Sequence, residues 1–209
     1  MKKIFGLIAT LMLSVAMINC SVNKSVKEVK VLGDCKFRLA SADSIYLAGI
    51  DVNEFKNVRD IKDIDVMRYP QLGLGFLRKN IPLDLRLNIE AMNPTKQLAG
   101  VEQMEYKVLL GESEIFSGVH NQRIEILPNS GRTIIPIKLS TNAYNLVMDN
   151  ATRNDFVKLM EAMTSTNSNK TVKMQVKIKP TLAFGKKQIN YPGYITFEKE
   201  ISASDLLER

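Results

Sequence analysis

The sequence is poor in the residues on which enzymes most often depend. Its 209 residues include no Trp, a single His (His120) and two Cys (Cys20 and Cys35). Because His is the usual proton donor or acceptor near neutral pH, one His in the whole chain argues against acid–base catalysis. The acidic residues show no spacing with His or Cys that would bind a metal. We therefore expect a protein that is not an enzyme, with no catalytic residue, no metal and no cofactor.

The chain also lacks the clustered positive charge of a nucleic-acid-binding module. It has 29 Lys and Arg against 22 Asp and Glu, a formal charge of +7. These charges are spread along the chain without Arg-rich or aromatic-interleaved runs, so no nucleic-acid partner is expected. With 45% hydrophobic and 24% charged residues, the composition is that of a folded protein, and the length suits one domain.

Only one long apolar run is present. Ile4–Ile18 follows Lys2 and Lys3, and it is shorter than the roughly 20 residues that a transmembrane helix needs. A positive start followed by a short apolar run is typical of an export signal, which is removed from the mature protein. Residues 1–19 are therefore predicted to be a signal peptide.

The signal segment ends on a sequence, MINCS, that resembles the lipobox of bacterial lipoproteins. In that motif the Cys is diacylated and becomes the mature N-terminus. Cys20 takes this place here, although Met17 and Asn19 replace the usual Leu and small residue. The resemblance implies a lipidated N-terminus and tether over residues 20–33. It also implies anchoring to the cell envelope, at the outer rather than the inner membrane, with the domain in the periplasm. The alternative is cleavage after Ala16, which leaves an exported protein without lipid.

Three further reactive residues are interpreted as structural. Cys35, in CKFRLAS, is expected to be a small buried residue of a strand. It has no disulfide partner if Cys20 is acylated, whereas cleavage after Ala16 would leave Cys20 free to pair with it. Ser113 lacks the Gly two places later that a nucleophile elbow requires. His120 follows a strand end and is assigned no catalytic role.

Several pairs and clusters carry weaker signals. Gly73 and Gly75 lack the third Gly of a dinucleotide fingerprint and predict a flexible connection. A group of lysines could contact anionic lipid head groups, but the favoured interpretation is that they solvate a strand face and guard an edge strand. The acidic pairs are placed in loops or on exposed strand positions. The lysines are Lys173, Lys177, Lys179, Lys186 and Lys187, and the acidic pairs are Asp63/Asp65 and Glu112/Glu114.

The clearest local pattern is a strand over residues 81–92 that stops at Asn93-Pro94. Its apolar and polar side chains alternate with the period of a strand that has one buried face. The chain is then expected to cross to a second sheet, because Asn bonds its own backbone, or adopts the left-handed conformation, and Pro withholds a donor. Leu85, Leu87, Ile89 and Ala91 are predicted to face the core, with Arg86 and Glu90 outside.

Other segments complete a mainly β pattern with one helical interruption. A hairpin is predicted over 34–53 with its turn at Ala42–Ser44, followed by a short helix near 60–67. The residues from Asn142 to Met163 have helical spacing, with Asn142 as N-cap and a break near 150–154. Turn signals are placed at Gly111, Gly118, Pro128–Gly131 and Gly185–Lys187. Further strands are predicted near 101–110, 113–119, 122–128, 133–140, 171–180 and 189–201, with Val172, Met174, Val176 and Ile178 buried and Lys173, Lys177 and Lys179 exposed.

The order of these elements resembles the group 2 late embryogenesis abundant family, also called the water stress and hypersensitive response domain. The matching stretches are LRLNIEAMNP, YKVLLGES, FSGV and ILPNSGRTIIPIKLS with the helix after it, and lipid-anchored bacterial members have a similar CKFRL…AGI hairpin. The resemblance spans Ile81 to about Ile201. It implies a fibronectin-like or immunoglobulin-like antiparallel β-sandwich with a helix across one end and no catalytic residues.

Together these features predict the division of the chain and its role. Residues 34–80 form a hairpin and an irregular segment, 81–201 the sandwich core, and 202–209 a tail. The expected function is that of a non-enzymatic, membrane-anchored lipoprotein, an interaction or stress-protective module of the envelope. Its partners would be membrane lipid, through the acyl group on Cys20, and an envelope protein. The alternative is a binding or transfer module for an apolar or lipidic ligand.

Overall fold

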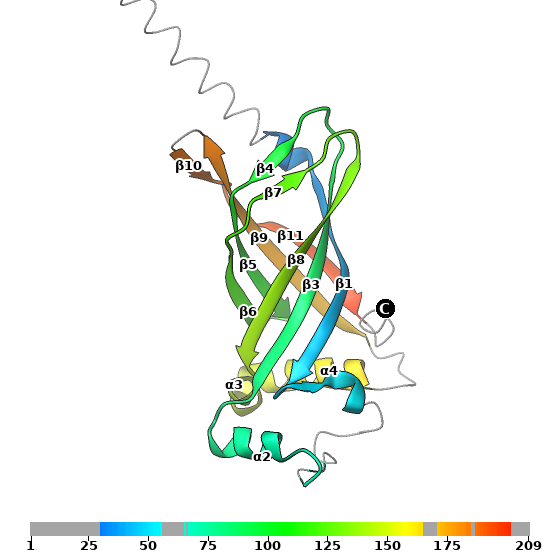
Figure 1. Ribbon diagram of the computed structural model, residues 1–209, viewed down its shortest axis with the longest axis vertical. Coiled ribbons are helices and arrows are strands. Elements are labelled where there is room, and N and C mark those ends of the chain that lie inside the picture. Colours follow the sequence, from blue (N-terminus) through cyan, green and yellow to red (C-terminus); the bar gives the residue numbers. More distant parts are fainter. Residues whose placement is uncertain (1–29, 56–64, 66, 165–170, 185–186, 202–209) are drawn as a thin grey trace, which may run out of the picture.

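The protein is a β-sandwich in which helices cover one end (Figure 1). The computed structural model describes residues 30–55, 65, 67–164, 171–184 and 187–201. One sheet has the strand order β2-β1-β3-β8, and the other has the order β10-β9-β5-β6, with β11 also paired to β9. All these pairings are antiparallel. The mainly β, sandwich-like fold expected from the sequence is confirmed.

The strands of the two sheets range from 2 to 13 residues in length. A small third sheet, β4 with β7, lies at the upper end of the sandwich (Figure 1). The first sheet contains β1 (Lys36–Leu47), β2 (Ile50–Asp51), β3 (Pro82–Asn93) and β8 (Gly131–Asn142). The second contains β5 (Gln103–Leu110), β6 (Ser113–His120), β9 (Val172–Phe184), β10 (Lys187–Asn190) and β11 (Ile195–Ile201), and the third pairs β4 (Ala99–Val101) with β7 (Ile124–Ile126).

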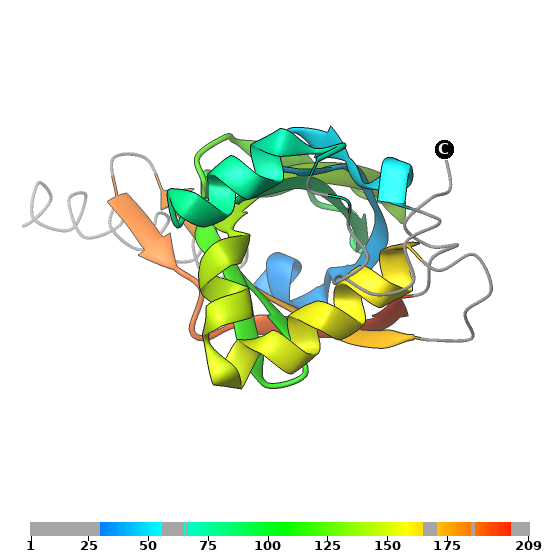
Figure 2. The same ribbon diagram turned by 90° about the horizontal axis from the view of Figure 1, so that it is seen from below.

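The α-helices α2, α3 and α4 gather at the lower end, where Figure 2 shows them along the rim of the sandwich. A helical turn over residues 30–34 lies at the other end. In the part of the chain that the structure describes, no helix is long and apolar enough to cross a membrane. The helices are η1 (Val52–Phe55), α2 (Pro70–Leu77), α3 (Ala143–Met148) and α4 (Asn150–Thr164).

The strand β3 is the centre of the first sheet and follows the predicted register. It pairs with β1 on one side and with β8 on the other. Its alternate apolar side chains are buried, whereas Arg86 is exposed and Glu90 is half-buried on the outer face. The prediction of which side chains face the core is therefore confirmed. The buried set is Leu85, Leu87, Ile89 and Ala91, at 6%, 0%, 0% and 0% exposure.

The strand β3 ends at Asn93, the one fully buried polar residue in the described core. Its Nδ2 donates to the carbonyl oxygens of Gln97, at 2.7 Å, and Ile126, at 3.2 Å, and its Oδ1 accepts from the backbone N–H and the hydroxyl of Thr95. The residue keeps a negative φ, so hydrogen bonding of the amide, and not a left-handed backbone, ends the strand. The chain then crosses to the second sheet through β4, as the sequence predicted.

The predicted hairpin turn at Ala42–Ser44 is wrong. These residues lie within β1, which continues to Leu47, and the turn is formed by Ala48 and Gly49, both with positive φ. Positive φ at two central residues suits the twist of a two-residue hairpin. At Ser44, with φ 53°, the pairing of β1 with β3 shifts register. The residues predicted to form a turn therefore form a β-bulge within β1.

The connection from η1 to β3 also differs from the prediction. Most of the helix predicted near 60–67 lies outside the described residues, but a helix, α2, occupies the place of the predicted flexible connection. Pro70 stands at its first turn, where a missing N–H costs nothing. Gly75 is buried, and a Cβ at this position would stand 2.9 Å from the Ile81 side chain, too close for any larger residue. Close packing, and not flexibility, explains this glycine.

The helical segment after β8 is confirmed, with an earlier break than predicted. The Asn142 side chain accepts from the N–H of Tyr144 at 3.1 Å and caps α3. Asp149, in extended conformation, separates α3 from α4. Ala143 and Leu146 are the buried residues of α3, whereas Met148, which the sequence placed on the apolar face with Tyr144 and Val147, is exposed. In α4 the buried side chains are Phe156, Leu159 and Met160.

The C-terminal region also departs in detail from the predicted strands. The strand β9 buries Val172, Met174, Val176 and Ile178, as expected. The single strand predicted over 189–201 is divided into β10 and β11, because Pro192-Gly193, with φ 115° at Gly193, turns the chain. Gly118, predicted to be a turn, lies within β6, where a Cβ would stand 2.5 Å from the hydroxyl of Tyr106. That hydroxyl donates across the sandwich to the carbonyl oxygen of Lys138 at 3.3 Å.

The register of β3 gives a direct test of the core. Leu87→Ala removes a fully buried side chain, and should lower the free energy of unfolding by about 2–5 kcal/mol. Arg86→Ala removes an exposed ion pair with Asp43 at 2.7 Å, so it should cost less than about 1 kcal/mol. Urea denaturation of both variants measures the difference, and equal losses would contradict the register.

The role of Asn93 gives a second test. Asn93→Asp keeps the shape of the side chain but replaces its donor nitrogen, leaves the carbonyl groups of Gln97 and Ile126 without this donor and buries a charge. We expect a loss of more than about 2 kcal/mol in unfolding free energy. Asn121→Asp makes the same chemical change at an exposed position and should have little effect. Equal stability of the two variants in urea would show that the amide is not needed.

Candidate functional site

The two residues closest to hydrolase chemistry, Ser113 and His120, lie at opposite ends of β6. The Ser113 hydroxyl lies 3.1 Å from the carbonyl oxygen of Ala151 and 3.2 Å from a carboxylate oxygen of Asp155, which ties β6 to α4. His120 pairs with Met104 at the other end of the strand, and partial burial lowers its pKa. The structure therefore does not bring this serine and this histidine together.

Cys35 is a buried thiol, as predicted, but it lies between the turn of helix at 30–34 and the start of β1 and not within a strand. Its Sγ donates to the carbonyl oxygen of Val31 at 3.3 Å. Burial, and secondarily the negative charge of Asp34, raise the pKa of the thiol to about 11, so it stays protonated at neutral pH, in the less nucleophilic form. Cys20 lies outside the described residues, and its lipidation stays a prediction.

The acidic pairs do not converge on a metal site. Asp65 accepts two backbone N–H groups of the turn that leads into α2, and Glu114 forms an ion pair with Lys107 at 3.0 Å. Glu112 is exposed, and Asp63 lies outside the described residues. Among the residues whose positions are described, no group of three or more His, Cys, Asp or Glu side chains could hold a metal ion.

Three of the lysines singled out from the sequence, Lys173, Lys177 and Lys179, lie on β9, which is an inner strand and not an edge. For these three, the role as guards of an edge strand is wrong, because β5 covers one side of β9 and β10 and β11 the other, whereas Lys187 lies on β10 at the edge of the sheet. Lys173 pairs with Glu198 at 2.5 Å, and Lys179 lies 5.8 Å above the ring of Tyr194. Lys177 is near enough to Glu114 to help lower the pKa of that carboxyl, after Lys107 and Ser117. The side chains of Lys186 and Lys187 lie outside the description.

The outer face of the first sheet also carries ion pairs between its own side chains. Arg38 donates two hydrogen bonds of 2.8 Å to Glu90, and these hydrogen bonds lower the pKa of that carboxyl. Arg86 binds Asp43 at 2.7 Å. A shallow groove of about 360 Å³ beside this pair is lined by Ser44, Asp84, Leu85, Arg86, Lys138, Leu139 and Ser140. Ion pairs thus engage part of the charge of this face, whereas Lys138 forms none with a described carboxylate.

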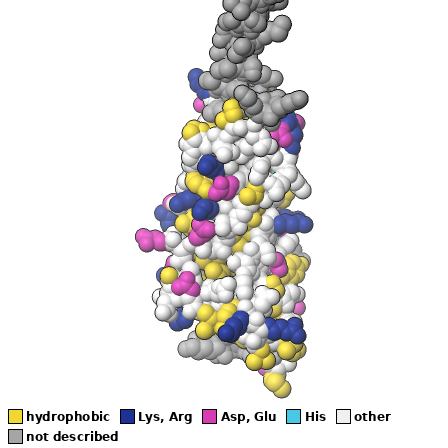
Figure 3. Space-filling view, turned by 90° about the vertical axis from the view of Figure 1, so that its left-hand side faces the viewer, with side chains coloured by type: hydrophobic (Ala, Val, Ile, Leu, Met, Phe, Trp, Pro, Cys, Tyr) yellow, Lys and Arg dark blue, Asp and Glu magenta, His cyan; other side chains and the backbone are white. Residues whose placement is uncertain are grey.

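The helical end exposes five large apolar side chains, more than either sheet, where the exposed ones are Tyr46 and Ile134 in the first and Val119 and Ile189 in the second. We call this surface the α2 end and define it by Met67, Leu74, Phe76, Leu77 and Met148, which are 91%, 48%, 46%, 82% and 54% exposed. Hydrophobic and basic side chains gather together at the lower end of the molecule (Figure 3). Soluble proteins rarely expose a contiguous apolar patch without a partner to cover it. The α2 end is therefore the candidate functional site.

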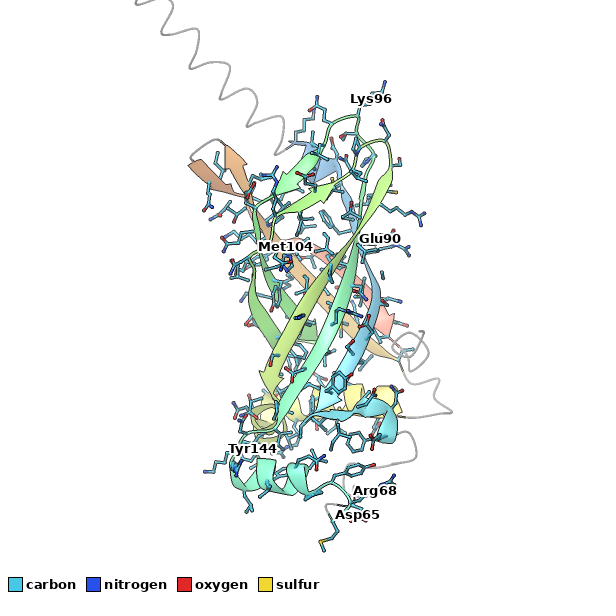
Figure 4. The ribbon with its side chains drawn as sticks, viewed as in Figure 1. Asp65, Arg68, Glu90, Lys96, Met104 and Tyr144 are labelled. Carbon is cyan, nitrogen blue, oxygen red and sulfur yellow. The ribbon has the colours of Figure 1, made fainter. Side chains whose placement is uncertain are left out.

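The position of the α2 end is fixed by one polar residue, Asn142. Its side chain accepts from the N–H of Ile81 at 2.9 Å and donates to the carbonyl oxygen of Lys79 at 2.9 Å, while it caps α3. The ring of Phe76 in α2 meets the ring of Tyr144 in α3 edge-on, at 6.2 Å between centroids (Figure 4). The sequence identified Asn142 as a helix cap but not as the link between α2 and α3.

The sequence contains a feature that indicates this surface, but the prediction of a flexible connection did not use it. The eight residues of α2, PQLGLGFL, contain no charge and only one polar side chain, and Arg78 and Lys79 follow directly. An uncharged run of this kind is unusual for a connection on the surface, where polar residues prevail. Gly73 and Gly75 suggested a loop, and for this reason the uncharged run was not interpreted as a helix.

Comparison with known proteins gives a limited likeness. No protein-family model matches the sequence, and no curated protein matches it. A putative late embryogenesis abundant protein of known structure is 20% identical, with 62% of this chain and 67% of that chain covered and a TM-score of 0.34. A protein from Arabidopsis thaliana is 15% identical, with 57% of this chain and 70% of that chain covered and a TM-score of 0.36. A protein from Archaeoglobus fulgidus is 16% identical, with 58% of this chain and 85% of that chain covered and a TM-score of 0.35. The late embryogenesis abundant family stays a resemblance.

The environment of Cys35 predicts its reactivity and its effect on stability. The raised pKa means that folding favours the protonated thiol. The contribution of Cys35 to the free energy of unfolding should therefore be constant below about pH 9, the ordinary pKa of a cysteine thiol. It should fall as the pH rises from there toward 11, because the unfolded chain loses its proton first. Cys35→Ala should lose less stability over this range. Alkylation by iodoacetamide at pH 8 should require unfolding, and rapid alkylation of the native protein would contradict burial.

Proposed function

We propose that this protein is a non-enzymatic interaction module of the bacterial cell envelope, held there by lipid on Cys20, which meets its partner with the α2 end. The observation that carries the proposal is the set of five large apolar side chains exposed around α2 and α3. The two sheet faces described above engage several of their charges in ion pairs and expose fewer large apolar side chains, so the α2 end is the surface that gains most from being covered.

The arrangement of the chain supports attachment at one end and contact at the other. The helical turn over 30–34, which overlaps the end of the predicted tether and buries Val31 and Leu32, lies at the upper end, whereas α2 lies at the lower end (Figure 1). Gly33 packs against Tyr191, next to the turn between β10 and β11. The twelve residues of β3 run between the two ends, a length of about 40 Å. A lipid on Cys20 would thus leave the α2 end free to face a partner.

The positions of the reactive residues support a non-enzymatic role. The Ser113 hydroxyl and the Cys35 thiol each bond a neighbouring carbonyl oxygen and help to hold helical segments in place. The second function expected from the sequence, transfer of an apolar ligand, would need space between the sheets. The described inner positions are filled with large apolar side chains, and Tyr106 reaches across to Lys138 of the other sheet. Contact at the surface is therefore the better supported function.

The anchor is tested by cell fractionation. The wild-type protein should be found in membranes and should carry label from a fatty acid. Cys20→Ser should abolish the label and the lipoprotein cleavage, while the domain stays folded, because the described core begins at Val31. Cys35→Ala, the matched change at the other cysteine, should keep both label and membrane attachment. A soluble wild-type protein with Met17 as its N-terminus would overturn the anchor.

A further inference from the structure

The helix α2 is apolar on both its inner and its outer sides. Leu72 and Gly75 face the protein and are buried. At 3.6 residues per turn the opposite side carries Pro70, Leu74 and Leu77, and Leu77 is 82% exposed. A helix that is hydrophobic all round is normally covered all round. The outer side of α2 therefore requires a second apolar environment beyond the sandwich.

The rim of this apolar surface is positively charged. Arg68 precedes α2, Arg78 and Lys79 follow it, and the sequence contains no acidic residue between Asp65 and Asp84. Within the described segments, no ion pair joins these three cations to a carboxylate. Arg68 lies over the ring of Tyr69 at 5.3 Å, and Figure 4 shows it at the lower end of the molecule.

The acidic residues near the rim are already engaged by backbone groups. Asp65 accepts the N–H of Met67 at 2.9 Å, and Asp149, beside Met148, accepts the N–H of Ala151 at 2.9 Å. Each carboxylate thus caps a turn at the edge of the surface. Among the described residues around Leu74 and Leu77, the three cations outnumber these two carboxylates, so a partner that presents negative charge is favoured.

We propose that the α2 end docks on an anionic phospholipid bilayer, with Leu74 and Leu77 inserted between the head groups and Arg78 and Lys79 against the phosphates. The surface is a projecting helix whose apolar side chains point outward, which suits insertion into an interface and not the filling of a groove. Apolar residues on one side and Lys or Arg at head-group depth are what interfacial helices use. The inference rests on the proposed function in taking the α2 end as the contact surface, and it is independent of lipid on Cys20.

The test uses the chain from Cys20 to Arg209 with Cys20→Ser, so that no acyl group contributes to binding. This chain keeps every described core residue from Val31 to Ile201. Co-sedimentation is measured with vesicles of phosphatidylcholine mixed with phosphatidylglycerol and with vesicles of phosphatidylcholine alone. The protein should bind the mixed vesicles roughly tenfold more tightly, and added salt should weaken that binding.

Three variants identify the residues responsible. Leu74→Gln/Leu77→Gln should weaken binding to the mixed vesicles by at least about tenfold, and Arg78→Gln/Lys79→Gln should remove most of the salt dependence. The control, Val119→Gln/Ile134→Gln, changes two exposed apolar residues of the strands, at 46% and 52% exposure, and should bind as the parent chain does. Thermal unfolding verifies each fold, and Leu77→Gln alone serves if the double variant is unstable.

Each other outcome would overturn the proposal. Equal binding to both kinds of vesicle would exclude recognition of anionic lipid, and equal binding by the α2 variant and the control would exclude this surface. A dimer in gel filtration that Leu77→Gln dissociates would show that a second copy covers α2. Because the chain under test carries no acyl group, failure here leaves the fractionation of the Cys20→Ser protein as a separate result on the anchor.

Discussion

The structure depends on the pairing of β3 with β8 and on the two asparagines that close its ends. All twelve residues of β3 pair with the twelve of β8, from Pro82 opposite Asn142 to Asn93 opposite Gly131. At one end the buried amide of Asn93 holds the loop that follows β3 and joins it to β7. At the other end the amide of Asn142 holds the chain that leaves α2 and caps α3. Side-chain amides can do this because they donate and accept at once, and leaving the fully buried amide of Asn93 unsatisfied is costly.

Most features of this structure that depend on neighbouring residues could be predicted from the sequence, and those that depend on tertiary contacts could not. The alternation over 81–92 predicted the buried face of β3, since a period of two admits only one register once one face is covered. The cap at Asn142 was predictable from residue type. The turn at Ala48 was not, because a non-Gly residue with positive φ gives no compositional signal and Asp43-Ser44 gives a misleading one. The helix α2 was missed because its formation depends on tertiary contacts, such as Gly75 against Ile81.

The candidate site was the least predictable part for a related physical reason. Sequence patterns identify residues that face the core, but exposed and buried apolar residues look alike until the packing is known. Only the structure shows that Leu72 is covered and that Leu77 is not. Conversely, lysines that suggested a lipid contact lie on β9 beside Glu198 and Tyr194, which balance or cover them. At the α2 end, exposed apolar side chains occur together with three cations that form no ion pair with a described carboxylate.

The absence of Trp from the chain makes the central claim, that the outer side of α2 becomes covered by a bilayer, open to a direct measurement. Leu77→Trp places the sole indole of the protein at that surface, and Ile134→Trp places it on the outer face of β8. The account predicts that anionic vesicles shift the emission of the Trp at position 77 to shorter wavelength and that brominated acyl chains quench it, while the emission at position 134 stays unchanged. Unchanged emission at position 77, or equal changes at both positions, would contradict it.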